Sequence, residues 1–244
     1  MAKDVYLAGR PLRTFGARLR TDYEIAPEAP TQSLQVWPGD SCFQLLDDQP
    51  GLLSLTLPLD FLGEDRGEIA GHMAQLRGLL RGICEVDLGD GFLYRCCLTG
   101  VSGEEWAGEC LCSQILALKG MRHKEEITVS GSAPLTVFNP GTWPRTACTL
   151  TLKALNCSGS VTIALRQDGK DYLKWTLNGM SGALTGGDLI LSGQDKRNLY
   201  RGGNLPQGIM DWAEYPYLRP GTVSLEVTGL EDPQAEITFE PTYL

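Results

Sequence analysis

Histidine, the side chain that most often donates and accepts protons in enzymes, is rare in this sequence. Only His72 and His123 occur among the 244 residues, and we interpret both as packed or solvated side chains. The sequence contains no nucleophile elbow, no phosphate-binding loop, no dinucleotide-binding fingerprint and no His-Glu-x-x-His zinc motif. It therefore predicts a protein that is not an enzyme and that has neither catalytic nor cofactor-binding residues.

Adjacent carboxylates are the other candidates for acid–base chemistry, among them the pairs Asp47-Asp48, Glu104-Glu105 and Glu125-Glu126. A glycosidase needs two carboxyl groups at a defined separation in space. Adjacency in the sequence does not establish that separation. We interpret the three pairs as solvated loop charges.

The eight cysteines could form disulfides, bind a metal or remain free thiols. Most of them lie in apolar, strand-like runs, and no Cys-x-x-Cys pair of the kind common in zinc sites occurs. The N-terminal residues also lack an apolar signal segment. We therefore expect buried, reduced thiols without a bound metal, in a protein made in a cytoplasm. The eight residues are Cys42, Cys84, Cys96, Cys97, Cys110, Cys112, Cys148 and Cys157.

The composition is that of a folded, acidic protein. A net charge of −9 argues against binding to a nucleic-acid backbone, which depends on lysine and arginine. No run reaches the roughly 18 apolar residues that a membrane-spanning helix requires. We expect neither specific nucleic-acid binding nor membrane insertion. The 29 glycines and 14 prolines favour short strands joined by tight turns.

Residues 1–127 are predicted to form a β domain, sandwich-like, with one helix at about 65–82. Asp65 can cap the start of that helix and Gly82 can close its end. Asp90-Gly91 is a hairpin signal after the helix. The apolar residues that recur at helical spacing, and that we expect to face the core, are Ile69, Met73, Leu76, Leu79 and Leu80.

Residues 128–244 are predicted to form a second domain, beyond a polar stretch near 121–127. Strand-like runs alternate with turn signals at short intervals, and no helical pattern is present. This arrangement is typical of a β-sandwich. The expected strands are 135–138, 149–154, 161–166, 172–177, 189–192 and 223–228.

Aromatic residues gather in the second half. Exposed rings can stack on sugars, so the alternative function is a carbohydrate-binding β-sandwich module of a glycan-recognition system. Packing in a core or an interface explains the same residues equally well. They are Trp143, Tyr172, Trp175, Tyr200, Trp212, Tyr215 and Tyr217.

Two turns and one helix entry carry a family resemblance. Asn139-Pro-Gly follows the strand at 135–138 and leads to the strand at 149–154, and Tyr215-Pro-Tyr-Leu-Arg-Pro-Gly leads into the alternating strand at 223–228. In the first half, Leu59-Asp-Phe-Leu-Gly-Glu-Asp-Arg leads into the helix. Over most of its length the chain resembles the distal tail proteins (Dit) of long-tailed, non-contractile bacteriophages. It departs from their pattern at Pro140 and in its cysteine content.

The resemblance implies a structural virion protein with a galectin-like second domain. Such proteins form a homohexameric ring at the distal end of the tail, through the first domain. The ring joins the tail tube protein and the tape-measure protein to the tail-tip or baseplate hub protein, and a contact with receptor-binding proteins is left open. The acidic balance would then suit a bore that repels DNA, lined by residues such as Asp47-Asp48 or Glu104-Glu105. It could equally serve solubility alone.

Overall fold

The structure is a computed structural model that describes residues 4–36, 43–49, 51–156, 159–177, 185–205, 210–211 and 214–244. The chain forms two compact units, Met1–Lys124 with Tyr243–Leu244, and Glu125–Thr242. The division expected at 127/128 falls at the first residue of β11 (Ile127–Ser132). Tyr243 and Leu244, which we assigned to the second domain, belong to unit 1 because β23 (Thr242–Tyr243) pairs with β10 (Leu111–His123). The expected mainly β class is confirmed, and the described residues contain one α-helix.

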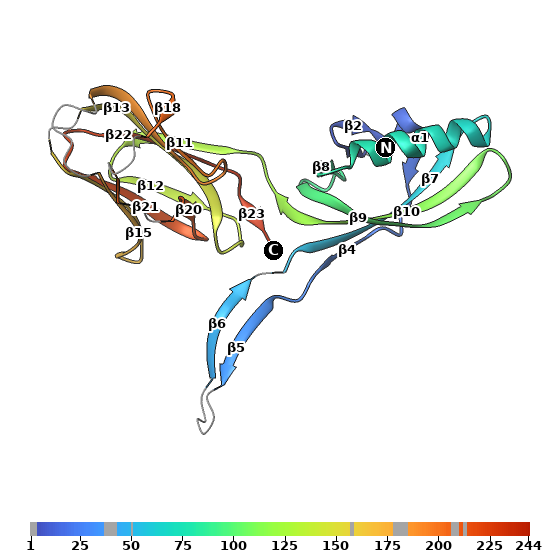
Figure 1. Cartoon of the computed structure of the whole chain (residues 1–244), viewed down its shortest axis with the longest axis horizontal. Helices are drawn as coiled ribbons and strands as arrows, with labels where there is room; N and C mark the ends of the chain where they lie inside the picture. The colour runs from blue at the N-terminus through green and yellow to red at the C-terminus, as the bar shows by residue number, and fades with distance from the viewer. Residues whose placement is uncertain are drawn as a thin grey trace. The chain divides into compact units, whose positions relative to one another are not determined.

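Unit 1 is built on one large β-sheet (Figure 1). Its elements besides β10 and β23 are β1 (Tyr6–Leu7), β2 (Arg10–Pro11), the short 3-10 helix η1 (Leu12–Phe15), β3 (Ala17–Leu19), β4 (Glu24–Pro27), β5 (Thr31–Val36), β6 (Phe43–Gln49), β7 (Leu53–Leu62), α1 (Arg66–Leu79), β8 (Ile83–Asp87) and β9 (Leu93–Trp106). In the described residues the sheet has nine strands, along the path β2-β1-β8-β9-β10-β7-β3, with β4 on β7 and β23 on β10. The hairpin expected around Asp90-Gly91 is confirmed, since Asp87 pairs with Leu93 across it.

Helix α1 begins where the sequence predicts. Asp65 has an extended backbone, and its side chain accepts a hydrogen bond of 2.8 Å from the backbone N–H of Glu68. The Glu68 side chain in turn accepts one of 2.6 Å from the N–H of Glu64. The first bond satisfies a donor that a helix start leaves unpaired, and the second holds the residue before the cap against the first turn. The helix ends at Leu79, and Gly82 follows with φ +83°, where a residue without Cβ is favoured.

The apolar stripe of α1 packs on the sheet, as expected. The side chains of Ile69, Met73, Leu76 and Leu80 are buried. They join one core with the alternate leucines of β7, such as Leu57, and with residues of β8, β9 and β10. Figure 1 shows α1 lying across one face of the sheet. The helix thereby provides the second layer that the sheet needs to bury its apolar face.

We expect the Asp65→Ala substitution to lower the free energy of unfolding of unit 1 by about 0.5–2 kcal/mol, because the N–H of Glu68 loses its acceptor. Chemical denaturation monitored by circular dichroism measures the change. Asp65→Asn is the matched control, since an asparagine side chain also caps. Equal losses for the two variants would show that capping is not the cause.

Unit 2 is a sandwich of two sheets. Its elements besides β11 are β12 (Leu135–Asn139), β13 (Thr146–Asn156), β14 (Val161–Gln167), β15 (Lys170–Leu177), β16 (Thr185–Ser192), β17 (Arg197–Tyr200), β18 (Gly203–Asn204), β19 (Met210–Asp211), β20 (Tyr217–Leu218), β21 (Gly221–Thr228) and β22 (Gln234–Phe239). In the described residues one sheet runs β11-β22-β13-β16-β17-β18, with β20 on β13, and the other runs β12-β21-β14-β15-β19. Buried residues of both sheets form one core around Trp175. Each of the six strands expected from the sequence is present.

The two turn motifs of unit 2 lie against each other. Asn139 pairs with Gly221 across β12 and β21. The buried amide of Asn139 donates to the carbonyl oxygens of Leu218 and Arg219, at 3.5 and 3.3 Å. Its side-chain oxygen accepts a bond of 3.0 Å from the N–H of Gly141. Asparagine is therefore used here as a buried connector between segments about 80 residues apart.

Strands β5 and β6 form a separate two-stranded ribbon that we call the arm. Figure 1 shows it extending away from the ends of β4 and β7. In the described residues β5 and β6 pair with each other and with no other strand. This hairpin was not predicted from the sequence.

Candidate functional site

The two histidines lie on different elements of unit 1. His72 lies half-buried on α1. His123, in the polar stretch expected near 121–127, is the last residue of β10 and only 4% exposed. Its Nδ1 lies 3.2 Å from the Lys124 carbonyl oxygen, and its Nε2 lies 3.6 Å from a Glu85 carboxylate oxygen. Both contacts fit the expected role in packing.

The carboxylate pairs are placed on strands as well as on loops. Glu104 and Glu105 are exposed on β9, where Glu104 lies 3.3 Å from the Arg77 guanidinium and accepts a bond from the Trp106 ring N–H. Glu125 and Glu126 are exposed between β10 and β11. Asp47 and Asp48 belong to β6, and their side chains lie outside the described part of the chain. The loop placement is therefore wrong for two of the pairs, since Glu104-Glu105 and Asp47-Asp48 lie on strands.

Six cysteines are described, and all six are free thiols. Cys84, Cys96, Cys112 and Cys148 are buried, as expected, but Cys97 and Cys110 are exposed. Cys110 precedes β10, so it does not share a strand face with Cys112. Cys42 and Cys157 lie outside the described residues. Within the described ranges, no group of three His, Cys, Asp or Glu side chains could hold a metal ion.

We expect thiol titration of freshly purified protein, unfolded without reductant, to give close to eight thiols per chain. The reason is that none of the six described cysteines is paired with another through a disulfide. A colorimetric disulfide-exchange reagent measures the count. Four stable disulfides in protein that never met an oxidant would contradict the interpretation.

Some aromatic residues of unit 2 lie in the core and others lie at the surface. Trp175 is 1% exposed and donates its ring N–H to the Glu214 carbonyl oxygen at 3.0 Å. Tyr217 is buried, and the Tyr172 hydroxyl donates to its carbonyl oxygen at 3.1 Å. Trp143, Tyr200 and Tyr215 are half-buried, and Trp212 lies outside the described residues. Core packing therefore explains the two most deeply buried rings.

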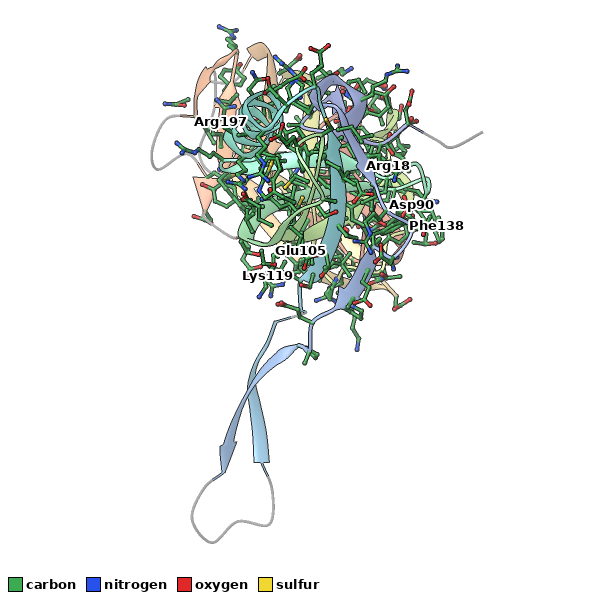
Figure 2. The ribbon with its side chains drawn as sticks, turned by 90° about the vertical axis from the view of Figure 1, so that its right-hand side faces the viewer. Arg18, Asp90, Glu105, Lys119, Phe138 and Arg197 are labelled. Carbon is green, nitrogen blue, oxygen red and sulfur yellow. The ribbon has the colours of Figure 1, made fainter. Side chains whose placement is uncertain are left out.

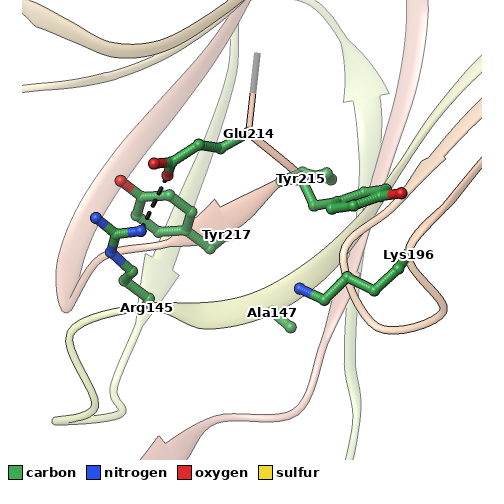
Figure 3. Close-up of a pocket in the computed structure, with 7 residues that line it drawn as sticks. Arg145, Ala147, Lys196, Glu214, Tyr215 and Tyr217 are labelled. Carbon is green, nitrogen blue, oxygen red and sulfur yellow. Dashed lines mark hydrogen bonds and ion pairs between the residues drawn. The ribbon is translucent and has the colours of Figure 1, made fainter. Parts of the chain in front are cut away.

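A groove of about 570 Å³ crosses the surface of unit 2 (Figure 3). Figure 3 shows Arg145, Glu214 and Tyr217 on one side, Tyr215 and Lys196 on the other, and Ala147 between them. The Arg145 guanidinium lies 3.0 Å from a Glu214 carboxylate oxygen and 5.0 Å from the centre of the Tyr217 ring. The Lys196 ammonium lies 5.2 Å from the centre of the Tyr215 ring. Two cation–aromatic pairs thus lie on either side of Ala147 (Figure 3).

The position of Lys196 in the groove depends on a strained turn. Lys196 lies between β16 and β17 with φ +55°, in the left-handed region that non-glycine residues rarely occupy. The turn is held by a bond of 3.0 Å from the Asp195 N–H to the Ser192 hydroxyl. Sequence reasoning noticed Tyr215 and Tyr217 but missed Arg145, Lys196 and Glu214. No local pattern relates these residues, because they meet only through the pairing of distant strands.

The residues that join the arm to the sheet are in close contact with each other. The Glu28 N–H donates to the Leu52 carbonyl oxygen at 2.8 Å. A Cβ at Gly51 would lie 2.1 Å from the Glu28 carbonyl oxygen, so only glycine fits there. The Lys119 ammonium of β10 lies 2.6 Å from the Glu28 carboxylate, and Figure 2 shows Lys119 where the arm leaves the sheet. The arm is therefore anchored to the sheet at its base.

No helix in the described part of the chain is both long and apolar enough to span a lipid bilayer.

This architecture is shared with solved structures of other proteins, although the sequence alone finds no match. No protein-family model and no curated protein matches the sequence. Among solved structures, the Dit protein (gp 19.1) of phage SPP1 superposes with a TM-score of 0.67 at 15% identity, over 99% of both chains. That protein is described as a paradigm of the hub adsorption apparatus in phages that infect Gram-positive bacteria. The chain has the fold of a phage Dit protein.

The Dit fold extends over both units, so the resemblance predicted from the two turns and the helix entry is confirmed at the level of the fold. Chains of the phage P2 baseplate in its activated conformation also match, with TM-scores of 0.48 for the calcium form and 0.49 for the strontium form. Each is 12% identical and covers 94% of this chain and 92% of the P2 chain. These lower scores carry no further weight.

Proposed function

We propose that this chain is a distal tail protein that forms a homohexameric ring at the tip of a phage tail. In this role it joins the tail tube protein and the tape-measure protein to the tail-tip or baseplate hub. The observation that carries the proposal is the match to the SPP1 Dit protein over 99% of both chains. A β-sandwich alone would say little, because that architecture serves many functions. The role is structural and needs no cofactor or metal.

The arm supports assembly with further copies or partners. A two-stranded hairpin is at best marginally stable on its own in water, and it gains stability from a third strand or a packed face. In the described residues of this chain the arm has no third strand. We infer that an adjacent subunit in the ring supplies the missing contact.

A second open edge is less suited to that contact. Strand β8 pairs with β9 only as far as Cys97, so residues 98–106 of β9 have a described partner on the β10 side alone. The β9–β10 register shifts twice along this stretch, between Ala117 and Leu118 and between Ser113 and Ile115. Such bulges are a common means of blunting an edge against pairing. The register of the arm shifts only once, between Ser33 and Leu34, so the arm is the better candidate for assembly.

The proposal is tested by replacing residues 31–49 with a short Gly-Ser linker. We expect the shortened protein to fold but to lose the ring, as seen by analytical ultracentrifugation beside the full chain. Unit 2 should unfold at the same denaturant concentration in both proteins, which serves as the control. A shortened protein that forms the same closed ring would remove the arm from the assembly mechanism.

The tail location has its own test. Gold-labelled antibodies against unit 2 should bind at the distal end of tails in electron micrographs, because the proposal places the ring there. A reconstruction of the same ring would show which residues line its bore, where we expect carboxylates such as Glu105 rather than lysine and arginine. Labelling along the whole tail or on the capsid would contradict the proposal.

The groove favours a carbohydrate-binding module as a second candidate function. The half-exposed Tyr215 ring can stack on a sugar, and the Lys196 ammonium and the Arg145 guanidinium can hold an acidic substituent. Binding of an acidic polysaccharide, measured by affinity electrophoresis, should then fall strongly in the Lys196→Ala variant. Lys153→Ala is the matched control, because Lys153 is also exposed in unit 2 but pairs with Glu236 and does not line the groove. Equal retention of all three proteins would exclude this candidate.

A further inference from the structure

Two buried thiols face each other across β8 and β9. Cys84 and Cys96 are direct partners in the antiparallel register of these strands. Their side chains are 8% and 2% exposed. Both lie on the face of the sheet that packs into the core of unit 1. No local sequence pattern relates the two cysteines, because their pairing depends on the hairpin register.

The strand geometry suits a covalent bond between the two sulfur atoms. Directly opposite residues of an antiparallel pair have Cα atoms about 4.5–5.5 Å apart. Disulfides join Cα atoms that are about 4.4–6.8 Å apart. Both side chains lie on the buried face of the sheet, directly opposite each other. No change of register is needed to bring them into bonding range.

The two thiols are chemically unequal. A hydrogen bond from Cys96 lowers the pKa of Cys84, against a smaller opposing effect of burial. The same hydrogen bond, followed by burial, raises the pKa of Cys96. Cys84 is thus the thiol that loses its proton first, and Cys96 remains the S–H donor. Redox-sensitive cysteines commonly combine such a thiolate with an adjacent resolving thiol.

The geometry points to Cys84 and Cys96 as an oxidative modification site that hydrogen peroxide converts to a cross-strand disulfide. The Cys84 thiolate attacks one peroxide oxygen, the O–O bond breaks, and hydroxide leaves with a proton to form water. This step oxidises the Cys84 sulfur to a sulfenic acid and reduces the peroxide. The Cys96 sulfur then loses its proton and attacks the Cys84 sulfur, and a second water leaves. Two thiols and one peroxide give one disulfide and two waters.

The neighbouring cysteine does not share this arrangement. Cys97 is exposed on the opposite face of β9, and its register partners are Ile83 on β8 and Lys119 on β10. It therefore has no thiol directly across from it. Gly120 of β10 stands opposite Cys96, and a Cβ there would lie 2.5 Å from the Cys96 Cβ. The absence of a side chain at Gly120 leaves room for Cys96.

A disulfide here would fasten the weakly held end of β8. Along β8, strand β1 pairs with Val86 and Asp87 only. In the described residues Ile83 and Cys84 therefore have a strand partner on the β9 side alone. Ile83 is 80% exposed at this end. A bond from Cys84 to Cys96 would prevent the end of β8 from separating from β9. It also closes a short loop, which restricts the unfolded chain.

The full-length chain, reduced and freed of reductant, is treated with a small excess of hydrogen peroxide. We expect a mass loss of 2 Da, a loss of two titratable thiols and a tryptic peptide pair joined through Cys84 and Cys96. The melting temperature of unit 1 should rise by about 4–8 °C. Dithiothreitol should reverse all of these changes. Cys84→Ser and Cys96→Ser should each abolish the joined pair, and Cys97→Ser should retain it.

Three results would overturn the inference. The first is a gain of two or three oxygen atoms on Cys84 without the joined peptide pair. The second is a disulfide that joins Cys97 in place of either residue. The third is a wild-type chain whose two thiols stay reduced while the exposed Cys97 is oxidised. Because the peptide map is read on the wild-type chain, the test does not depend on whether a serine variant folds.

Discussion

Replacing Trp175 with alanine is expected to lower the free energy of unfolding of unit 2 by about 3–5 kcal/mol. Trp175 is 1% exposed and is the largest fully buried side chain in the described residues. Its removal would leave a cavity between the two sheets and would take the hydrogen bond away from the Glu214 carbonyl oxygen. Chemical denaturation of the full chain, followed by a signal specific to unit 2, measures the loss.

Phe138→Ala is the matched control for Trp175→Ala. Phe138 is also an aromatic residue of unit 2, but it is 63% exposed, on β12. Its removal creates no cavity, and surface substitutions usually change stability by less than about 0.5 kcal/mol. If both variants lost the same stability, the core assigned to the sandwich would be wrong. A loss confined to Trp175→Ala would support it.

The Leu76→Ala variant should lose about 2–5 kcal/mol of the unfolding free energy of unit 1. Leu76 lies on the buried stripe of α1 and belongs to the core that the helix shares with the sheet. Gln75→Ala is the control, because Gln75 is the adjacent residue on the exposed side of the same helix. Alanine also favours a helix slightly more than glutamine does. A loss below half a kcal/mol for Leu76→Ala would show that the stripe does not pack on the sheet.

Local sequence patterns predicted individual helices and strands more readily than they predicted which strands pair with each other. Asp65, the stripe from Ile69 to Leu80 and the Asp90-Gly91 turn each act within a few residues of the chain, so the sequence displays them directly. Strand β22 was missed although Ala235, Ile237 and Phe239 alternate with polar residues, and all three are buried. This alternation is visible in the sequence and was sufficient to predict the strand.

The arm and the groove could not be predicted from local sequence patterns. In the described residues the arm is a hairpin without a third strand. The order of strands in a sheet depends on the whole fold and cannot be predicted from a local pattern. Arg145, Lys196 and Glu214 are separated by about 50 and 18 residues and meet through the pairing of β13 with β16 and of β13 with β20. Cys84 and Cys96 likewise become partners only once the register of β8 and β9 is fixed.

The mass of the assembled protein in solution tests the central proposal most directly. Native mass spectrometry or multi-angle light scattering of the full chain, across a range of concentrations, measures it. A hexameric ring of 26.6 kDa chains has a mass of about 160 kDa, and we expect that species with a closed, six-fold outline in electron micrographs. A strict monomer at every concentration, and in isolated tail tips as well, would contradict the proposal.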